Sequence, residues 1–251
     1  YVYRNGSVEV NDIYEIYTTS SFWNAFPRSP MVMDINFMGE NYFLINNHFK
    51  CCGDGIIDHD DISDEESRRY IAINLIKEYI DNNLSDKNVI VLGDLNDDIA
   101  EPLLNNVFQE VIDDSNNYRF ADIGIAQGNS SDWSFPDWPS HLDHILITDE
   151  LFNGINTLEV ETIKIDQFLD GGWNEYDQNI SDHRPVAIKF IFSLTSPYDI
   201  NDDGIVNDSD LLMLLSFILE NIEPIDLVDI NLDLEVNIFD LLLLSDYIQE
   251  L

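Results

Sequence analysis

Four short polar clusters combine residue types that bind metal ions and move protons. They are Asn46-Asn47-His48, Gly93-Asp94-Leu95-Asn96, Leu142-Asp143-His144 and Ser181-Asp182-His183. Carboxylates hold a hard divalent cation, and imidazoles exchange protons near neutral pH. If one cavity gathers these groups, it suits metal-assisted transfer of a phosphoryl group.

Each cluster adjoins a short apolar run of the kind that forms a buried strand. The polar residues follow the runs 42–45 and 89–92, but they precede the runs 145–148 and 185–192. If the first pair of strands runs antiparallel to the second pair, all four clusters meet on one rim. Taken singly, each cluster has a simpler interpretation as a turn or cap, and His48 as a buried, hydrogen-bonded histidine.

In order and spacing, the clusters resemble motifs of the endonuclease/exonuclease/phosphatase superfamily. The matching elements are His48 in N-x-H, Asp94 and Asn96 in G-D-x-N, Asp143 in D-H-I and residues 181–183 in S-D-H. The resemblance covers roughly residues 1–192. It implies an α/β fold of the DNase I-like type, in which two β-sheets form a sandwich flanked by helices.

The resemblance also implies that the chain is truncated at its N-terminus. The superfamily's first strands, which carry an Asn and a metal-binding Glu, are expected upstream of Tyr1, so this fragment is expected to lack part of its active site. Residues 2–10 hold Asn-Gly between two short alternating runs, a pattern that predicts a β-hairpin. Glu9 and Glu15 are expected to be solvated rather than to replace the missing ligand.

The activity implied by the resemblance is attack of water on a phosphoester. The implied catalytic residues are His48, Asp94, Asn96, Asp143 and His183, and Asp182 is the implied ligand of a catalytic Mg²⁺ or Mn²⁺. His183 would act as general base or bind phosphate, with Asp143 fixing its tautomer. Asp94 would orient or deprotonate the water, and Asn96 would contact a non-bridging oxygen. His48 would contact the phosphate or assist the leaving group.

Five further residues lie close to these motifs. His141 and His144 are expected to shape the rim of the site. Trp133, Phe135 and Trp138 either stack on a base or sugar or cover the core, and the core is favoured because no basic residues lie beside them.

The composition is that of a folded protein with a large negative charge. The 251 residues are 45% hydrophobic and 12% aromatic, which permits one large domain and a small one. The net charge of −38 repels a polyanion at long range, which disfavours tight non-specific binding of DNA. A saline habitat or calcium loading accounts for this acidity more simply than the substrate does.

The adjacent residues Cys51 and Cys52 are the two cysteines of the chain. Neighbouring Cα atoms are about 3.8 Å apart, whereas disulfides need about 4.4–6.8 Å. Two thiols or a strained link are therefore expected. A redox switch beside His48 is the lesser alternative, because the acidic neighbourhood is expected to oppose ionisation of a thiol.

Residues 54–61 resemble the second half of a calcium loop. Lys50 and Cys52 stand where the first half needs oxygen donors, so an exposed acidic loop is favoured over a metal site. Next, Ser63-Asp64-Glu65-Glu66 fits a capping box, which predicts a helix that runs to about Asn83 and packs on a sheet.

The last fifty-odd residues contain two acidic twelve-residue loops, each followed by a Leu-rich run. The first loop offers Asp199, Asn201, Asp203, Asn207 and Asp210, the carbonyl of Ile205, and Gly204 for the sharp turn. The second loop offers Asp229, Asn231, Asp233, Asn237 and Asp240 and the carbonyl of Glu235, with Leu234 in place of Gly. Weaker binding of Ca²⁺ is expected in the second loop. The Leu-rich runs are shorter than the roughly 20 residues of a membrane span.

Paired loops ending in Asp, each followed by one helix, resemble a dockerin, a calcium-folded module that binds cohesin domains. The expected domains are thus residues 1–195, similar to the superfamily above, and residues 196–251, similar to a dockerin. The resemblance implies a secreted or cell-surface protein, a cohesin partner and a link to polysaccharide breakdown.

Two classes of function remain open. The first is a metal-dependent phosphoester hydrolase with a dockerin tether, most simply a nuclease-like phosphodiesterase, with a lipid or small-molecule phosphodiesterase or phosphatase as the alternative. The second is a calcium-dependent binding protein whose enzyme-like domain is inactive.

Overall fold

The computed structural model describes residues 1–250 except 5, 7, 38, 153–157, 191–197, 202, 203, 221–227, 232 and 234. The chain divides into two compact units. One comprises Val10–Ile35 and Asn41–Phe190, and the other comprises Tyr1–Glu9, Asn36–Glu40 and Ile191–Leu251. The predicted domain boundary between residues 195 and 196 lies outside the described residues.

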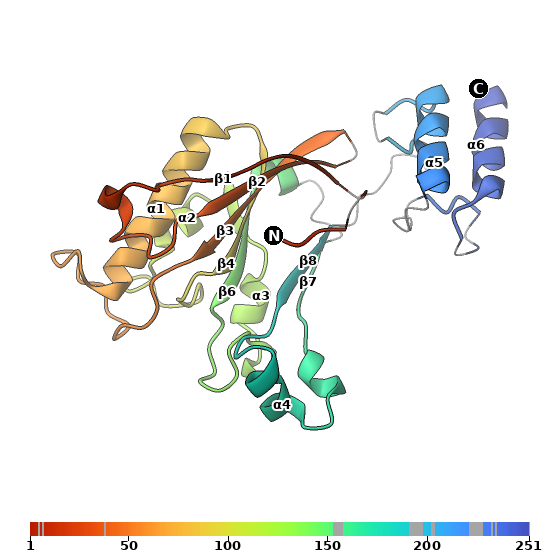
Figure 1. Ribbon diagram of the computed structural model, residues 1–251. Helices are drawn as coiled ribbons and strands as arrows, with labels where there is room; N and C mark the ends of the chain where they lie inside the picture. The colour runs from red at the N-terminus through yellow and green to blue at the C-terminus, as the bar shows by residue number, and fades with distance from the viewer. Residues whose placement is uncertain are drawn as a thin grey trace. The chain divides into compact units, whose positions relative to one another are not determined.

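A six-stranded sheet with the order β1-β2-β3-β4-β6-β5 forms the centre of the larger unit (Figure 1). The strands are β1 (Glu9–Glu15), β2 (Met31–Phe37), β3 (Glu40–His48), β4 (Asn88–Asp94), β5 (Tyr118–Phe120) and β6 (Asp143–Thr148). β3 and β4 are parallel, and β4 and β6 are antiparallel. For these three strands the arrangement is the one that the polar clusters predicted, whereas the fourth run lies in a second sheet.

Both faces of the six-stranded sheet are covered by other elements, because alternate residues of β4 belong to two different hydrophobic cores. Val89 and Val91 belong to the larger core with Ile73 and Ile76 of α1 (Glu65–Asn83). Ile90 belongs to a second core, formed with β6 and with residues of a two-stranded antiparallel sheet. That sheet pairs β7 (Leu158–Thr162) with β8 (Val186–Phe190). Because successive residues of a strand point to opposite faces, β4 faces a helix on one side and a second sheet on the other.

The predicted fold class is confirmed: two sheets pack together and helices flank them. The shorter helices of the larger unit are α2 (Gln109–Asp113), α3 (Ile123–Ala126) and α4 (Gly172–Asn179), and its 3-10 turns include Ser20–Phe22, Ser130–Asp132 and Ile165–Phe168. They lie in the connections between strands.

Helix α1 ends where predicted but begins differently. Its N-cap is Asp64, whose side chain accepts a hydrogen bond from the backbone N–H of Ser67 at 2.8 Å. The predicted capping box, with Ser63 as the cap and Glu66 reaching back, is wrong. The Glu66 carboxylate instead turns inward and accepts a hydrogen bond from Gly55, 2.7 Å away.

The predicted hairpin at the start of the chain is also wrong. Residues 1–4 form no strand, although Gly6 has the positive φ, 85°, that the turn prediction requires. β1 pairs instead with β2, so the partner comes from a distant part of the chain. Glu9 and Glu15 on β1 are exposed, as predicted.

The smaller unit contains the two helices that the Leu-rich runs predicted. They are α5 (Asp208–Glu220) and α6 (Ile238–Glu250). A separate core joins them, with Ile200, Leu214, Val228 and Leu244 at its centre. Among the described residues, no helix has both the length and the apolar character to cross a membrane.

Candidate active site

The strand register brings three of the predicted residues side by side. His48 pairs with Asp94 across β3 and β4, and Asp94 pairs with Asp143 across β4 and β6. Gly93 makes this approach possible, since its φ is +128° and a Cβ atom there would lie 2.1 Å from the carbonyl oxygen of Asn47. Any other residue at position 93 would push the two strands apart just below the carboxylate.

His183 reaches the same rim from the loop before β8. Its Nδ1 donates a hydrogen bond to Oδ2 of Asp143 at 2.7 Å, and its backbone N–H donates to Oγ of Ser181 at 3.0 Å. The hydrogen bond to Asp143 raises the pKa of His183 above its ordinary value. Because Nδ1 carries the proton, Nε2 remains as the acceptor of the neutral ring.

Asp94 lies between these groups and is the most deeply buried of them. Its Oδ1 accepts a hydrogen bond from the backbone N–H of Asn96 at 3.0 Å, and its Oδ2 lies 3.7 Å from Nε2 of His48. Burial raises the pKa of Asp94, and the charge of Asp143 raises it further, against the opposite effect of His183 and His48. The site is thus short of positive charge.

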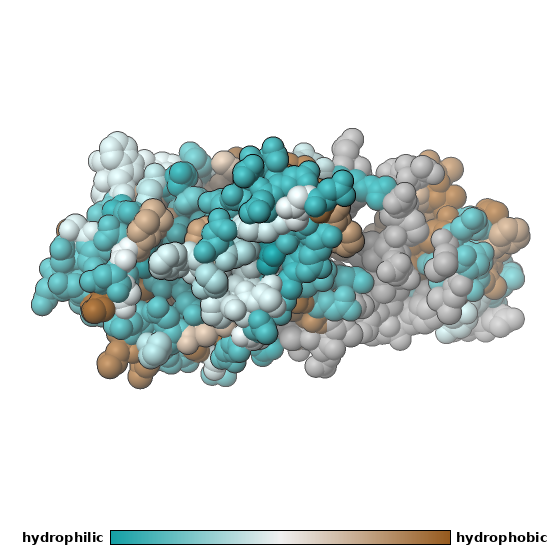
Figure 2. All heavy atoms as spheres, turned by 90° about the horizontal axis from the view of Figure 1, so that it is seen from below, coloured by the Kyte–Doolittle hydropathy of each residue, from teal (hydrophilic) through white to brown (hydrophobic). Residues whose placement is uncertain are grey.

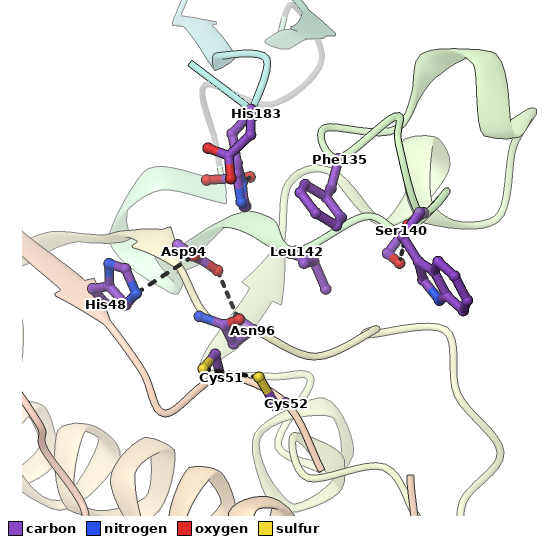
Figure 3. Close-up of a pocket in the computed structure, with 12 residues that line it drawn as sticks. His48, Cys51, Cys52, Asp94, Asn96, Phe135, Ser140, Leu142 and His183 are labelled. Atoms are coloured by element: carbon purple, nitrogen blue, oxygen red, sulfur yellow. Dashed lines mark hydrogen bonds and ion pairs between the residues drawn. The ribbon is translucent and has the colours of Figure 1, made fainter. Parts of the chain in front are cut away.

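All six residues predicted for the catalytic site line one cavity of about 680 Å³. The complete lining is His48, Cys51, Cys52, Asp94, Asn96, Phe135, Trp138, Ser140, Leu142, Asp143, Asp182 and His183. In Figure 3, His183 lies above Asp94, with His48 and Asn96 on either side. None of these described lining residues is Lys or Arg.

The lining residues fit a divalent cation. One ligand atom each from Asp94, Asp143 and His183 lies within 4.8 Å of the other two. Carboxylate oxygens are the donors that Mg²⁺ and Mn²⁺ prefer, and a cation would relieve the shortage of positive charge at Asp94. Asp182 lines the cavity as an exposed side chain, within the same wall as His183.

Sequence reasoning missed the residues that hold the Asp143–His183 pair in place. The buried Ser134 accepts hydrogen bonds at Oγ from the backbone N–H groups of Leu142 and Asp143, at 3.1 and 3.2 Å. Its carbonyl accepts a 2.7 Å bond from the N–H of Arg184. The Arg184 guanidinium in turn donates two hydrogen bonds to Asp166, at 2.9 and 2.7 Å. Nothing in the spacing of these residues signals the contacts.

His141 and His144 do not shape the rim as predicted, because both are buried in the core. His141 Nε2 lies 3.0 Å and His144 Nδ1 lies 2.6 Å from Oδ2 of Asp122. The other nitrogen of His144 lies 2.8 Å from the carbonyl oxygen of Asp97. Asp122, which sequence reasoning missed, therefore holds both imidazoles away from the cavity.

The three aromatic residues of the same loop have different environments. Trp133 is partly buried and donates from Nε1 to the carbonyl of Ile125 at 3.1 Å, consistent with the predicted core role. Phe135 lines the cavity, with its ring centroid 4.9 Å from that of His183. Trp138 is 79% exposed and lines the cavity, so the core prediction is wrong for it.

Cys51 and Cys52 are free thiols on the cavity wall, with their sulfur atoms 3.0 Å apart. The hydrogen bond from Cys52 lowers the pKa of the Cys51 thiol, and the charge of Lys50 acts in the same direction. The same hydrogen bond raises the pKa of Cys52, and burial and the charge of Glu65 act in that direction. The predicted opposition to ionisation therefore holds for Cys52 and not for Cys51.

The first acidic loop of the smaller unit is organised around Asp210. This buried carboxylate accepts hydrogen bonds from the N–H groups of Asn201 and Asn207, at 3.1 and 2.8 Å. Asp199, also buried, accepts one from Gly204 at 2.9 Å, and Gly204 has a φ of +81°. Asp203 lies outside the described residues.

The second loop repeats this arrangement around Asp240. Its carboxylate accepts hydrogen bonds from the N–H groups of Ile230, Asn231 and Asn237, at 2.9, 3.2 and 2.9 Å. The N–H of Asp233 donates to Asp229 at 3.1 Å, and the N–H of Glu235 donates to Asp233 at 2.9 Å. Leu234, at the predicted turn, lies outside the described residues.

Comparison with known proteins shows the fold class of the larger unit. TDP2 from D. rerio, in a crystal structure complexed with single strand DNA product, is 16% identical with a TM-score of 0.50, over 74% of this chain and 69% of that chain. An endonuclease/exonuclease/phosphatase from Bacteroides vulgatus is 15% identical with a TM-score of 0.46, over 75% and 69%. The human nocturnin catalytic domain with bound sulfate anion is 13% identical with a TM-score of 0.44, over 74% and 62%. The likeness to TDP2 shows that the fold is DNase I-like.

The C-terminal part of the smaller unit is recognised from its sequence. Residues 197–249 match the family model for the dockerin type I domain. The chain therefore has a dockerin type I domain that follows, in sequence, a part with a DNase I-like fold. No curated protein sequence matches the chain significantly.

Proposed function

We propose that this protein is a metal-dependent phosphoester hydrolase, with His48, Asp94, Asn96, Asp143 and His183 as its catalytic residues. One observation carries the proposal: Asp94, Asp143 and His183 converge in one cavity with their ligand atoms within 4.8 Å of one another. Acid–base groups beside a cluster of carboxylates are what hydrolysis of a phosphoester requires. The DNase I-like fold is compatible with this reaction but does not identify it.

We assign the roles as follows, with the contacts within the cavity as support. Asp143 holds the His183 ring in the tautomer that leaves Nε2 free to accept a proton from water or to contact phosphate. Asp94 orients the attacking water, and the Asn96 side chain contacts a non-bridging oxygen. His48, on the opposite side of Asp94 from Asp143, assists the leaving group. Asp182 would help to hold Mg²⁺ or Mn²⁺ beside the cluster of Asp94, Asp143 and His183, and the cation would neutralise charge on the phosphate.

The favoured substrate class is a single-stranded nucleic acid, cleaved at a phosphodiester. Trp138 and Phe135 offer aromatic surface on the cavity wall, and bases stack on such surfaces whatever their sequence. The absence of Lys and Arg from the described lining, together with the net charge of −38, predicts weak binding that depends on the divalent cation. A lipid or small-molecule phosphoester is the second candidate, favoured by the same lack of cationic side chains.

The test is a hydrolysis assay on the complete gene product, with Mg²⁺ or Mn²⁺ present or chelated. Single-stranded DNA and RNA, a phospholipid and a simple phosphodiester are compared as substrates. We expect cation-dependent cleavage that His183→Gln abolishes and that the matched control His59→Gln, at an exposed histidine outside the cavity, leaves unchanged. No cleavage of any of the four substrates would instead support a binding protein with an inactive enzyme-like domain.

We also infer that the dockerin domain binds Ca²⁺ in both loops and attaches the enzyme to a cohesin domain outside the cell. The buried carboxylates of Asp210 and Asp240 support the calcium sites, because each closes a loop rich in oxygen donors. Leu212 and Leu242, at equivalent positions of α5 and α6, are exposed and suit contact with a protein partner. Apolar side chains are visible over these helices in Figure 2.

Binding to a cohesin, measured by calorimetry with Ca²⁺ and again with a chelator, tests the tether. We expect binding only with Ca²⁺, and a marked loss of affinity in the double variant Leu212→Ala, Leu242→Ala. The chain with both leucines intact but Leu103→Ala, an exposed leucine of the other unit, is the matched control. Failure to bind cohesins of several types would contradict the tether without affecting the hydrolase proposal.

A further inference from the structure

A further group of acidic side chains spans the loop before α1 and the first turn of that helix, outside the lining of the cavity. One carboxylate oxygen each from Asp54, Asp64 and Glu66 lies within 4.8 Å of the other two. Atoms that bind one Ca²⁺ at about 2.3–2.6 Å are at most about 5 Å apart, so these oxygens fit a single coordination sphere. Neither the dockerin loops nor the catalytic residues contribute to this group.

Glu66 provides a second observation that points to a cation. Its side chain is 2% exposed, and its Oε2 has no hydrogen-bond partner in the described structure. Oε1 accepts a bond from Gly55 and lies 3.2 Å from Nη2 of Arg69. A buried charged oxygen without a partner is costly, and native structures normally pair such an atom with a donor or a metal ion.

The charge balance around Glu66 also calls for a cation. The buried Arg69 guanidinium lies 3.2 Å from Glu66, and it also donates a 2.8 Å hydrogen bond to Asp97, which is itself buried. The single positive charge of Arg69 therefore faces two buried carboxylates, those of Glu66 and Asp97. Asp54 and Asp64 add further negative charge. A divalent cation beside Glu66 would compensate the excess negative charge.

The backbone of the loop is shaped to bring these groups together. Cys52, Gly53 and Gly55 have positive φ values of 72°, 117° and 79°. A Cβ atom on Gly53 would lie 2.1 Å from Oε1 of Glu66, so the chain wraps closely over this carboxylate. Asp54 stands within the same bend, and Asp64 is the N-cap of α1.

We propose that Asp54, Asp64 and Glu66 bind a calcium ion that fixes this loop against α1. The ion would also stabilise one wall of the catalytic cavity. Arg69 donates hydrogen bonds to the carbonyls of Lys50 and Cys52, at 2.9 and 2.6 Å. The group that pairs with Glu66 thus holds the segment that presents Cys51 and Cys52 to the cavity (Figure 3).

The experiment counts bound calcium in the full chain. After chelation and dialysis, calcium binding is measured by equilibrium dialysis in excess Mg²⁺, which keeps weak sites free of Ca²⁺. Asp54→Asn is compared with Asp60→Asn, which removes the same charge from an exposed position in the same loop and outside the cluster. The number of bound calcium ions per chain is compared at the lowest calcium concentration that saturates the unchanged chain. We expect Asp54→Asn to bind one calcium ion fewer than the unchanged chain, and Asp60→Asn to bind the same number.

Limited proteolysis locates the effect in the loop. Calcium should slow cleavage between residues 50 and 64 in the unchanged chain and in Asp60→Asn, but not in Asp54→Asn. Because the Asp54 side chain is exposed, this variant is expected to fold. Glu66→Gln, in the first turn of α1, is a second variant that should also bind one calcium fewer. Equal calcium counts and equal loop protection in Asp54→Asn and the unchanged chain would overturn the proposal.

Discussion

Two aspartate–histidine clusters in the larger unit use the same residue types in opposite environments. At the cavity, Asp143 and His183 are joined by a 2.7 Å hydrogen bond, and their side chains are 21% and 23% exposed. In the core, Asp122 lies 2.6 Å from His144, and neither side chain is exposed. Burial alone would raise the pKa of Asp122, but the charge and hydrogen bonds of His144 and His141 hold it below its usual range.

The difference lies in what remains available after the hydrogen bonds are made. Both oxygens of Asp122 are occupied, by two imidazoles and by the N–H of Ile145 at 2.9 Å. His183 keeps Nε2 for a molecule that enters the cavity. The contact between an acid and an imidazole does not by itself mark a catalytic pair; access to a free nitrogen and a nearby cation site does.

In the comparison of the two clusters, the largest expected effect comes from Asp143→Asn. An amide cannot hold His183 in the required tautomer, so hydrolysis should fall by about 10²–10⁴-fold while the chain stays folded. The measurement is the rate of phosphodiester cleavage, with circular dichroism as the check on folding. An unchanged rate would contradict a catalytic role for the Asp143–His183 pair.

The buried cluster should respond in stability rather than in chemistry. Asp122→Ala leaves two imidazoles and an N–H without their acceptor, which should lower the free energy of unfolding by about 3–5 kcal/mol. Urea unfolding measures this. The matched substitution Asp143→Ala should cost less than half as much, because its partner remains in contact with water. Equal losses for the two variants would mean that exposure does not separate the clusters.

A smaller effect is expected from the aromatic wall of the cavity. Trp138→Ala should weaken binding of single-stranded DNA by about 1–3 kcal/mol if bases stack on the ring, and should leave a simple phosphodiester unaffected. The measurement is the KM of the variant and of the unchanged chain for each of the two substrates. Trp23→Ala, at another exposed tryptophan that does not line the cavity, is the control. If KM for DNA is unchanged, the second substrate class is favoured.

The smallest effect concerns pH. The pKa of His144 is raised: burial lowers it, but the charge of Asp122 and the hydrogen bonds outweigh burial. Protonated His144 is more stable in the folded chain than in the unfolded chain. Its contribution to the free energy of unfolding is therefore complete below the unfolded-state pKa of about 6.5, and it is lost as the pH rises through the higher folded-state pKa. Unfolding free energies measured from pH 6 to 9, with Ca²⁺ saturating, should therefore decline. The decline should be shallower in Asp122→Asn, and an identical slope in that variant would contradict this assignment.

Much of the site could be predicted because strands fix the positions of neighbouring residues. The apolar runs 42–45 and 89–92, each ending in polar residues, predicted that His48 and Asp94 lie on one rim, and the strand register places them side by side. Repeated loop spacing likewise predicted the helices after Asp210 and Asp240, and the match at 197–249 agrees.

The remaining features depend on partners that no local pattern specifies. His141 and His144 are buried because Asp122, about twenty residues upstream, lies beside them. Glu66 turns inward because Arg69 and Gly55 meet it there, whereas a capping box would turn it outward. Trp138 is exposed because the loop is anchored by Ser134 and Trp133, which leaves the second tryptophan outside the core. Tertiary contacts override local preference in each case.

Ser134 has a practical consequence for redesign. Its hydroxyl accepts a hydrogen bond from the N–H of Asp143, and its carbonyl accepts one from the N–H of Arg184, next to His183. One small residue therefore positions the backbone on both sides of the Asp143–His183 pair. The Trp138 side chain, which is exposed at the cavity wall, makes neither of these contacts. Libraries that diversify Trp138 are therefore expected to change which molecules enter the cavity while the Asp143–His183 pair keeps its alignment.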